Sequence, residues 1–332
     1  MGNGADVDVH HASLRRARSS IGCCGASAAP PMSYVLVLMW ALLAAASSAA
    51  DIQQVACLQD GTIVGRDAQL MLRSWGDGTW GGAEGTAEVS DFWTSSTGQV
   101  YARETGPKIV LLKPGMSRQQ VNLPAMRASS LAFGTGAAGG VTVASIDEMF
   151  QLKADGTASS IGQPPRVEAT SDFRPSQPPV VFSTANGSVA CFPGSPFEID
   201  NGMKGVCLKT GDSPYHYRVD FGRFSDRTRA APFLCGDVLV SSIGDQTQAR
   251  ALSDGRRVGQ TRGPARTGSR CIGDGRILLV GPDRLRFFEG PTLKRSRLER
   301  VRGRIRDVAV CPKQLALLRD DSQIVLMASP TN

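Results

Sequence analysis

After residue 50, hydrophobic residues come in short runs that are separated by Gly, Asp, Asn and Pro. No stretch of this region keeps the 3.6-residue spacing of an amphipathic helix. Short apolar runs between turn-forming residues are typical of antiparallel β-hairpins. The chain after residue 50 is therefore predicted to be all β.

One arrangement of turns recurs seven times along this region. The first turns are anchored at spacings of 37 to 49 residues, at Gly61, Gly98, Gly139, Gly187, Gly236, Gly275 and Lys313. A second turn follows each first turn after six to eight residues, and a third turn often follows the second. Three turns make four short antiparallel strands, and a unit of about forty residues has the size of a propeller blade.

We therefore predict a seven-bladed β-propeller over residues 51–332, with about forty residues in each four-stranded blade. A single sheet cannot cover both of its faces, and radial stacking covers them. A β-sandwich or two small barrels are the alternatives, but seven units with one internal order favour the propeller. The last unit ends after three strands, so residues 51–54 are expected to supply its fourth strand; the alternative is a last blade of three strands.

Residues 1–50 differ from the rest of the chain. Basic residues precede an apolar run over residues 34–46, and small residues continue to Ala50. A basic region, a short apolar core and small residues are the parts of a signal peptide. We predict a leader that is cleaved near Ala50 and a secreted or otherwise extracytoplasmic protein, with Met32 as an alternative start. The competing interpretation is a membrane anchor over residues 34–50.

Export would place the cysteines in an oxidising compartment, where disulfides form. Of eight cysteines, two lie in the predicted leader and six in the predicted propeller. Four of the six fall near the ends of the first strands of consecutive blades, and the other two share the fourth blade. The predicted disulfides are Cys57–Cys311, Cys191–Cys207 and Cys235–Cys271. Buried free thiols are the alternative, and the absence of any CxxC spacing among the six argues against zinc.

One segment resembles a known family. Residues 54–64 (QVACLQDGTIV) and residues 74–82 (SWGDGTWGG) are similar to one repeat of the RCC1-type propellers, whose extracellular bacterial versions carry a Cys-Ala-Leu, Asp-Gly, Trp-Gly pattern. The His that precedes this pattern is missing, and elsewhere only Asp-Gly turns persist, as in KADG and LSDG. The resemblance implies a propeller and carries over no chromatin or nucleotide-exchange function.

Residues for catalysis are scarce. His216 is the only histidine after the predicted leader, which excludes a multi-histidine metal site and limits a Ser–His–Asp site to this residue. No P-loop, GxSxG or HExxH motif occurs. We predict no catalytic residue, metal or cofactor. One alternative is a glycan-processing hydrolase or lyase with carboxylates at the propeller mouth, and another is a structural subunit of a larger assembly.

Positive charge is concentrated in one part of the chain. The net charge is +7, and residues 250–306 hold 16 basic and five acidic residues. In the densest part, residues 294–306 (KRSRLERVRGRIR), every second residue from 300 to 306 is arginine, and a continuous strand would place these side chains on one face. Guanidinium groups bind phosphate, sulfate and carboxylate. The alternative is charge that protects an edge strand from unwanted pairing.

A second candidate is the extra length of the fourth repeat, residues 209–231, which carries Tyr and Arg side chains of the kind found in binding hot spots. The alternative is an extra hairpin whose aromatic residues pack on the blade. The predicted binding residues are Tyr215, His216, Tyr217, Arg218, Arg295, Arg297, Arg300, Arg302, Arg304 and Arg306.

These patterns together predict a non-catalytic extracytoplasmic protein that binds an anionic ligand through blades 4–6. An acidic protein or an acidic glycan is the expected partner. The basic region lacks the interleaved aromatic residues that single-stranded nucleic acid requires, which argues against nucleic acid. Contact with a membrane is expected only if the leader remains as an anchor.

Overall fold

The computed structural model describes residues 50–329 except 96, 106–107, 124–130, 136–139, 154, 167–177, 185–186, 195–202, 211–213, 223–228 and 273–274. The chain divides into one unit over Met1–Ser48 and a second over Ala49–Asn332. All the strands given below belong to the second unit. The predicted leader, up to residue 49, lies outside the described residues.

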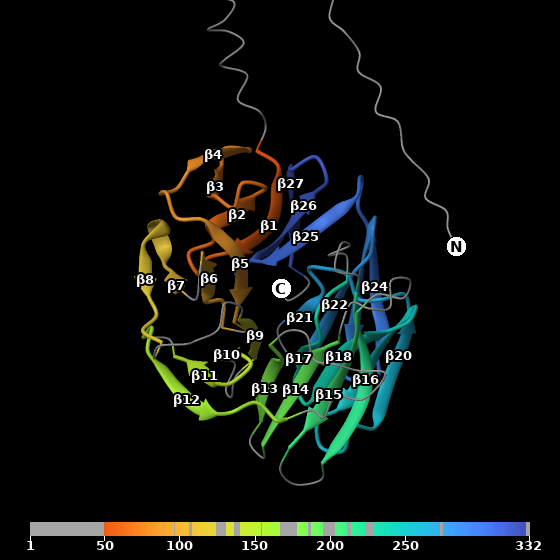
Figure 1. The fold of residues 1–332 in the computed structure, drawn as a ribbon. Coiled ribbons are helices and arrows are strands. Elements are labelled where there is room, and N and C mark those ends of the chain that lie inside the picture. The colour runs from red at the N-terminus through yellow and green to blue at the C-terminus, as the bar shows by residue number, and fades with distance from the viewer. Residues whose placement is uncertain are drawn as a thin grey trace, which may run out of the picture. The chain divides into compact units, whose positions relative to one another are not determined.

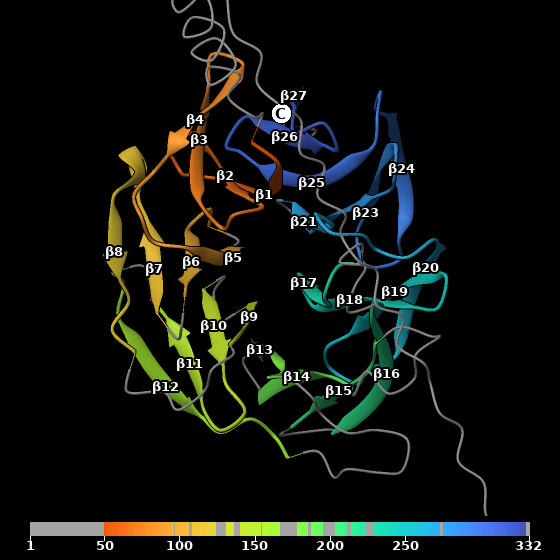
Figure 2. The same ribbon diagram turned by 45° about the horizontal axis from the view of Figure 1, so that its top comes forward.

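The second unit is all β, and its sheets follow one another around a ring (Figures 1 and 2). The first sheet contains β1 (Ile52–Cys57), β2 (Ile63–Asp67), β3 (Leu72–Gly76) and β4 (Thr79–Ala83). The second contains β5 (Val89–Thr94), β6 (Val100–Glu104), β7 (Ile109–Leu112) and β8 (Arg118–Gln120), with the short 3-10 helix η1 (Pro114–Met116) before β8. The third contains β9 (Ala132–Thr135), β10 (Val141–Ala144), β11 (Met149–Leu152) and β12 (Ala158–Gly162).

The second half of the ring begins with one large sheet. Its first strands are β13 (Val180–Thr184), β14 (Gly187–Pro193), β15 (Met203–Lys209) and β16 (Tyr215–Gly222). It continues with β17 (Phe233–Cys235), β18 (Val238–Ile243), β19 (Gln246–Ala251) and β20 (Arg257–Arg262). The next sheet contains β21 (Arg270–Ile272), β22 (Arg276–Val280), β23 (Arg284–Glu289) and β24 (Lys294–Arg300). The last contains β25 (Ile305–Val310), β26 (Gln314–Arg319) and β27 (Ile324–Ala328).

The prediction of seven separate four-stranded blades is wrong. The described residues form five separate blades, four with four strands and one with three, and an eight-stranded sheet occupies the place of predicted blades 4 and 5. The two halves of that sheet join because β16, eight residues long, reaches β18 and pairs Asp220 with Ser242. The Asp220 carboxylate also accepts hydrogen bonds from the Gly244 N–H and, at 3.1 Å, from Arg229 Nη1.

The expected closure of the last blade by residues 51–54 is also wrong. Residues 52–54 instead begin β1, which pairs with β2 as the inner strand of the first blade. The last blade therefore keeps three strands, and side chains rather than a shared sheet join it to the first blade. Residues 52–57 take this position because β1 carries the apolar residues that the first blade buries against its neighbours.

The hydrophobic core is divided among the contacts between neighbouring sheets. Val64, Leu72, Val100 and Val110 belong to one cluster between the first and second sheets. A comparable cluster between the last sheet and the first contains buried residues from β1 and β26. Each sheet thus covers the face of the next, which is the arrangement that makes a ring of such sheets stable.

The three cysteine pairs are the predicted ones: Cys57–Cys311, Cys191–Cys207 and Cys235–Cys271. The first and third connect neighbouring inner strands, and the second joins directly opposed residues of β14 and β15. Three disulfides indicate an oxidising environment outside the cytoplasm. Within the part of the chain that the structure describes, no helix has the length and hydropathy needed to cross a membrane.

Candidate partner-binding surface

The strands β20 and β24 are the outermost strands of neighbouring sheets, and they lie close together in both views (Figures 1 and 2). Gly259 in β20 packs against the turn between β23 and β24. A Cβ at this glycine would stand 2.5 Å from the Pro291 carbonyl oxygen, so only glycine allows this approach. The strand β20 therefore contacts the turn that leads into β24.

Arg286 in β23 strengthens this connection. Its Nη1 donates a hydrogen bond to the Arg262 carbonyl oxygen at the end of β20, and its guanidinium lies 5.9 Å from the centre of the Phe288 ring. Burial lowers the pKa of Arg286, and the positive charges of Arg284 and Arg295 lower it further. Positive charge is thus crowded at the junction of the two strands.

We define the basic rim as the exposed cationic residues of β20 and β24: Arg257, Arg262, Lys294, Arg295, Arg297 and Arg300. Among the described residues, Arg297 forms an ion pair with Glu299, and no other member of the rim pairs with a carboxylate. Flanking residues are neutralised, as in the 2.7 Å pair between Arg284 and Asp283. The rim therefore presents guanidinium groups that are available to an external anion.

The predicted row of four arginines on one strand is wrong. Arg300 ends β24, residues 301–304 form a bend, and Arg306 lies in β25. The chain must turn here because it leaves the outermost strand of one sheet for the innermost strand of the next. Arg302 and Arg304 are exposed on this bend, and Arg304 lies 3.5 Å from the Asp320 carboxylate.

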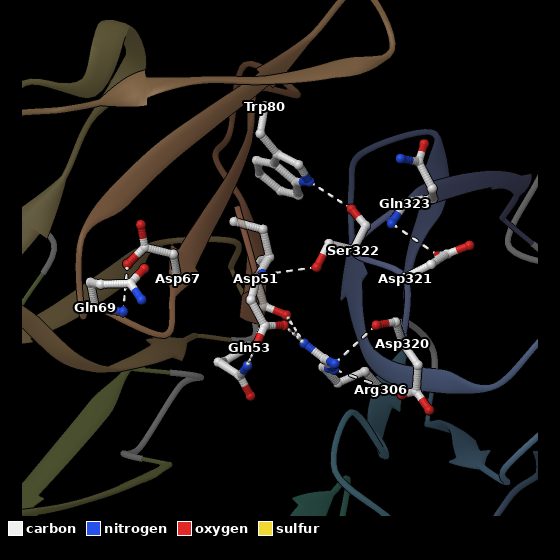
Figure 3. A network of polar contacts seen from close by, with 11 residues as sticks. Asp51, Gln53, Asp67, Gln69, Trp80, Arg306, Asp320, Asp321, Ser322 and Gln323 are labelled. Carbon is white, nitrogen blue, oxygen red and sulfur yellow. Dashed lines mark hydrogen bonds and ion pairs between the residues drawn. The ribbon is translucent and has the colours of Figure 1, made fainter. Parts of the chain in front are cut away.

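Arg306 belongs to the junction between the last and first blades (Figure 3). Its guanidinium donates to the Asp51 carboxylate, to the Ile52 carbonyl oxygen and, at 3.0 Å, to the Asp320 carbonyl oxygen. Ser322 adds two contacts, because its hydroxyl accepts the Ile52 N–H at 3.0 Å and its carbonyl oxygen accepts Trp80 Nε1 at 2.7 Å. Arg306 therefore joins the ends of the ring.

The four predicted residues of β16 do not form one site. Tyr215 and Tyr217 point to one face, where their rings stack at 6.0 Å and the Arg250 guanidinium lies 4.6 Å from the Tyr217 ring. Burial, followed by the charge of Asp254, raises the pKa of Tyr215 to about 12. His216 and Arg218 alternate with them and are exposed. The tyrosines thus pack within the sheet, as the alternative interpretation expected.

The sequence did not reveal a polar contact that recurs between inner strands. Asp307 follows a bulge in β25, and its Oδ2 accepts the Val55 N–H of β1 at 2.9 Å. Gln54 follows a bulge in β1, and its side chain exchanges hydrogen bonds with both the N–H (3.3 Å) and the carbonyl oxygen (3.2 Å) of Phe92 in β5. Each bulge places a polar side chain against the backbone of the next inner strand. Both bulges are seen in the strand register of the structure, and no sequence motif predicted them.

Asp307 is the described carboxylate that burial perturbs most clearly. Burial raises its pKa, whereas Arg270, 3.9 Å away, and two backbone N–H groups lower it. The oxygens of this carboxylate already accept the Val55 and Val308 N–H groups, so its role is to stabilise the fold. No cluster of metal-binding side chains occurs among the residues that the structure describes.

No known family model matches the chain, and no curated protein matches it. Several solved structures match the chain in fold. Virginiamycin B lyase from Staphylococcus aureus is 11% identical with a TM-score of 0.50, and the match covers 85% of this chain and 96% of that one. The WD40 domain of Neurospora crassa Pan2 is 10% identical with a TM-score of 0.53, covering 86% and 91%. BBS1N, solved in complex with ARL6DN, is 11% identical with a TM-score of 0.50, covering 85% and 94%.

The chain has a β-propeller fold. At such low identities the likeness establishes the fold alone, because propellers host many unrelated functions. The resemblance of residues 54–82 to RCC1-type repeats is not confirmed by these structures.

Proposed function

We propose that this protein is a non-catalytic, extracytoplasmic binding protein that recognises an acidic protein partner through the basic rim. The observation that carries the proposal is the set of exposed arginine side chains on the outermost strands of two neighbouring sheets, of which only Arg297 pairs with a carboxylate among the described residues. Arginine binds carboxylates with two parallel hydrogen bonds, so a row of such groups suits a row of Asp or Glu side chains. The three disulfides support a location outside the cytoplasm.

A protein is favoured over a small anion as the partner. Leu298, 41% exposed, lies within the rim between Arg297 and Glu299, and such a mixture of apolar and arginine side chains is typical of protein interfaces. BBS1N and a component of a mitotic checkpoint complex, both similar in fold, were solved in protein complexes. These neighbours are consistent with a protein partner.

A lyase activity receives less support. A histidine-to-alanine variant of virginiamycin B lyase is described as catalytically inactive. Among the described residues of this chain, His216 is the one histidine, and it is exposed on β16.

Charge reversal tests the proposal. The variant Arg257→Glu, Arg295→Glu, Arg300→Glu should bind poly-L-glutamate at least tenfold more weakly than the unmodified protein, and it should lose the partner captured from the native compartment. The matched control Lys113→Glu, Lys153→Glu, Arg166→Glu makes the same change in net charge at exposed positions outside the rim, and its affinity should stay within threefold. Equal losses in both variants, or no loss in the first, would reject the rim as the binding surface.

The leader remains a prediction. Amino-terminal sequencing of the protein from its native source should find a start near Asp51 if the leader is cleaved. A membrane-bound protein that retains residues 34–50 would instead support the anchor.

A further inference from the structure

The outermost strand of the last blade differs in character from the other outermost strands. The others are polar, charged or rich in glycine: β4 (TWGGA), β8 (RQQ), β12 (ASSIG), β20 (RVGQTR) and β24 (KRSRLER). In contrast, β27 reads IVLMA and carries no charge. Polar and charged residues protect an edge from pairing with another chain, whereas an apolar edge invites it.

The hydrogen-bonding pattern shows which groups this edge presents. The ladder between β26 and β27 begins at the Arg319 N–H, which donates to the Gln323 carbonyl oxygen at 3.0 Å. In an antiparallel ladder every second residue bonds to a given neighbour, so Val325 and Met327 bond to β26. The alternate residues direct their N–H and C=O groups to the open side of the strand: Ile324, Leu326 and Ala328.

The side chains of β27 show that one face of the strand is covered by the preceding blade. Val325 and Met327 pack against the core cluster that contains Leu285 and Phe287 of the preceding blade. Leu326 is 41% exposed, one of the few large hydrophobic side chains left in solvent among the described residues. The strand has the composition of an interior third strand, and the fourth strand that other blades have is absent from the described residues of this one.

The place of that fourth strand lies next to the basic rim. The sheets repeat around the ring, so a strand added outside β27 would take the position relative to β24 that β24 takes relative to β20. In that pair, Gly259 of β20 packs against the turn that leads into β24. The blades of β24 and β27 are in contact, since the Asp320 N–H donates to the Arg304 carbonyl oxygen at 3.1 Å. An added strand would therefore run beside exposed arginine side chains.

We propose that an extended segment of the acidic partner adds to the open edge of β27 as its fourth strand, with Asp or Glu side chains facing the arginines of β24. The inference rests on the proposed function, because it takes its acidic partner from the basic rim. Backbone hydrogen bonds to an edge strand supply affinity, and alternate side chains supply specificity. A second copy of this chain is disfavoured as the occupant, because it would bring two basic rims together.

A proline substitution tests the added strand. Leu326→Pro removes an N–H that faces the open edge, and proline is tolerated at such a position of an edge strand. Leu326→Ala keeps the N–H and is the matched control. The probe is a nine-residue peptide of alternating Val and Glu, and its binding to the full chain is measured by fluorescence anisotropy. We expect at least a tenfold loss of affinity for Leu326→Pro and less than threefold for Leu326→Ala, with unchanged circular dichroism. The peptide should slow amide exchange at Leu326 at least tenfold.

The outcomes separate this inference from the proposed function. If the charge-reversal variant of the basic rim loses binding and Leu326→Pro binds normally, the proposal of an added strand is wrong and the proposal of the basic rim as binding surface is retained. If Leu326→Pro loses binding and charge reversal of the basic rim has no effect, the rim is not the binding surface. The proposal of an acidic added strand is then rejected too, because it depends on the rim. Equal binding of a Val–Lys peptide would overturn the acidic specificity. A dimer with Leu326 protected in the absence of peptide would identify a second copy as the occupant and overturn the proposal.

Discussion

Single polar side chains connect neighbouring inner strands by hydrogen bonds to the backbone. Asp307 and Gln54 each follow a bulge and each bind the backbone of the next blade. A bulge re-aims the side chain that follows it, which explains why these residues leave their own sheet. Buried backbone groups need partners, so the loss of one such side chain leaves an N–H unsatisfied.

Asp307 provides the first test at this scale. Asp307→Ala removes the acceptor of two backbone N–H groups and leaves Arg270 without its nearby carboxylate. We expect a loss of roughly 2–4 kcal/mol in the free energy of unfolding. Urea denaturation measures this loss. The control Asp283→Ala, at a half-exposed position, should change stability by less than about 0.5 kcal/mol. Equal midpoints for the two variants would contradict the structural task of Asp307.

The buried phenol of Tyr101 predicts a dependence on alkaline pH. Its hydroxyl donates to the Lys153 carbonyl oxygen at 3.2 Å, and burial, followed by the charge of Asp155, raises its pKa to about 12. The unfolded chain releases this proton near pH 10, so the stability present below pH 10 is lost as the pH rises toward 12. Linkage gives a loss of about 2 kcal/mol over this interval. Tyr101→Phe should flatten urea midpoints between pH 10 and 12; an unchanged slope would assign the effect to other groups.

At the scale of elements, the edges of the sheets decide both architecture and function. The edge of β16 pairs with β18 and merges two repeats, and the outermost strands β20 and β24 carry the basic rim. The outer edge of β27 is apolar, and no described strand pairs with it. Strands with one unpaired side accept any partner that geometry brings near. Their side chains therefore determine which edges remain separate and which bind.

Asp220 tests the merged sheet. It is the residue of β16 that pairs with β18, and its carboxylate binds both Arg229 and the Gly244 N–H. Asp220→Ala should cost about 1–2 kcal/mol of stability and speed amide exchange at Gly244, because two polar contacts are lost. Asp245→Ala, exposed in the adjoining turn, is the control. If exchange at Gly244 is unchanged, the junction is held by the backbone alone.

For the whole molecule, the closure of the ring is the decisive feature. No strand is shared between the last and first blades in the described part of the chain, so the disulfide Cys57–Cys311, the contacts of Arg306 and the Trp80–Ser322 hydrogen bond close it (Figure 3). A cross-link between residues far apart in sequence restricts the unfolded chain most.

Removal of each disulfide in turn tests this closure. The sequence separations are 254 residues for Cys57–Cys311, 36 for Cys235–Cys271 and 16 for Cys191–Cys207. In the chain-entropy model, double Cys→Ser variants should lose about 5, 4 and 3 kcal/mol respectively. Urea denaturation under oxidising conditions measures the three losses of stability and so their order. If the pair 191–207 proves the most costly, local packing rather than ring closure dominates the effect of the disulfides.

The sequence by itself determined the features that depend on near neighbours: the all-β class, the positions of turns such as Gly61 and Gly275, which adopt φ of 90° and 73°, and the cysteine pairs that follow from the repeat register. Backbone conformation and side-chain alternation are encoded within a few residues, so a periodic pattern reports them. The concentration of arginine was visible too. The arrangement of the arginine side chains was not visible in the sequence. The bend at residues 301–304 interrupts the row, and Arg306 donates a hydrogen bond to Asp51.

Only the tertiary structure decided how the edges meet. Whether β16 pairs with β18, whether residues 51–54 join the last blade or the first, and whether Gln54 and Asp307 reach the next strand depend on distances between segments far apart in the chain. Backbone groups at an edge are chemically alike in every strand, so the sequence cannot distinguish the partners that folding brings together.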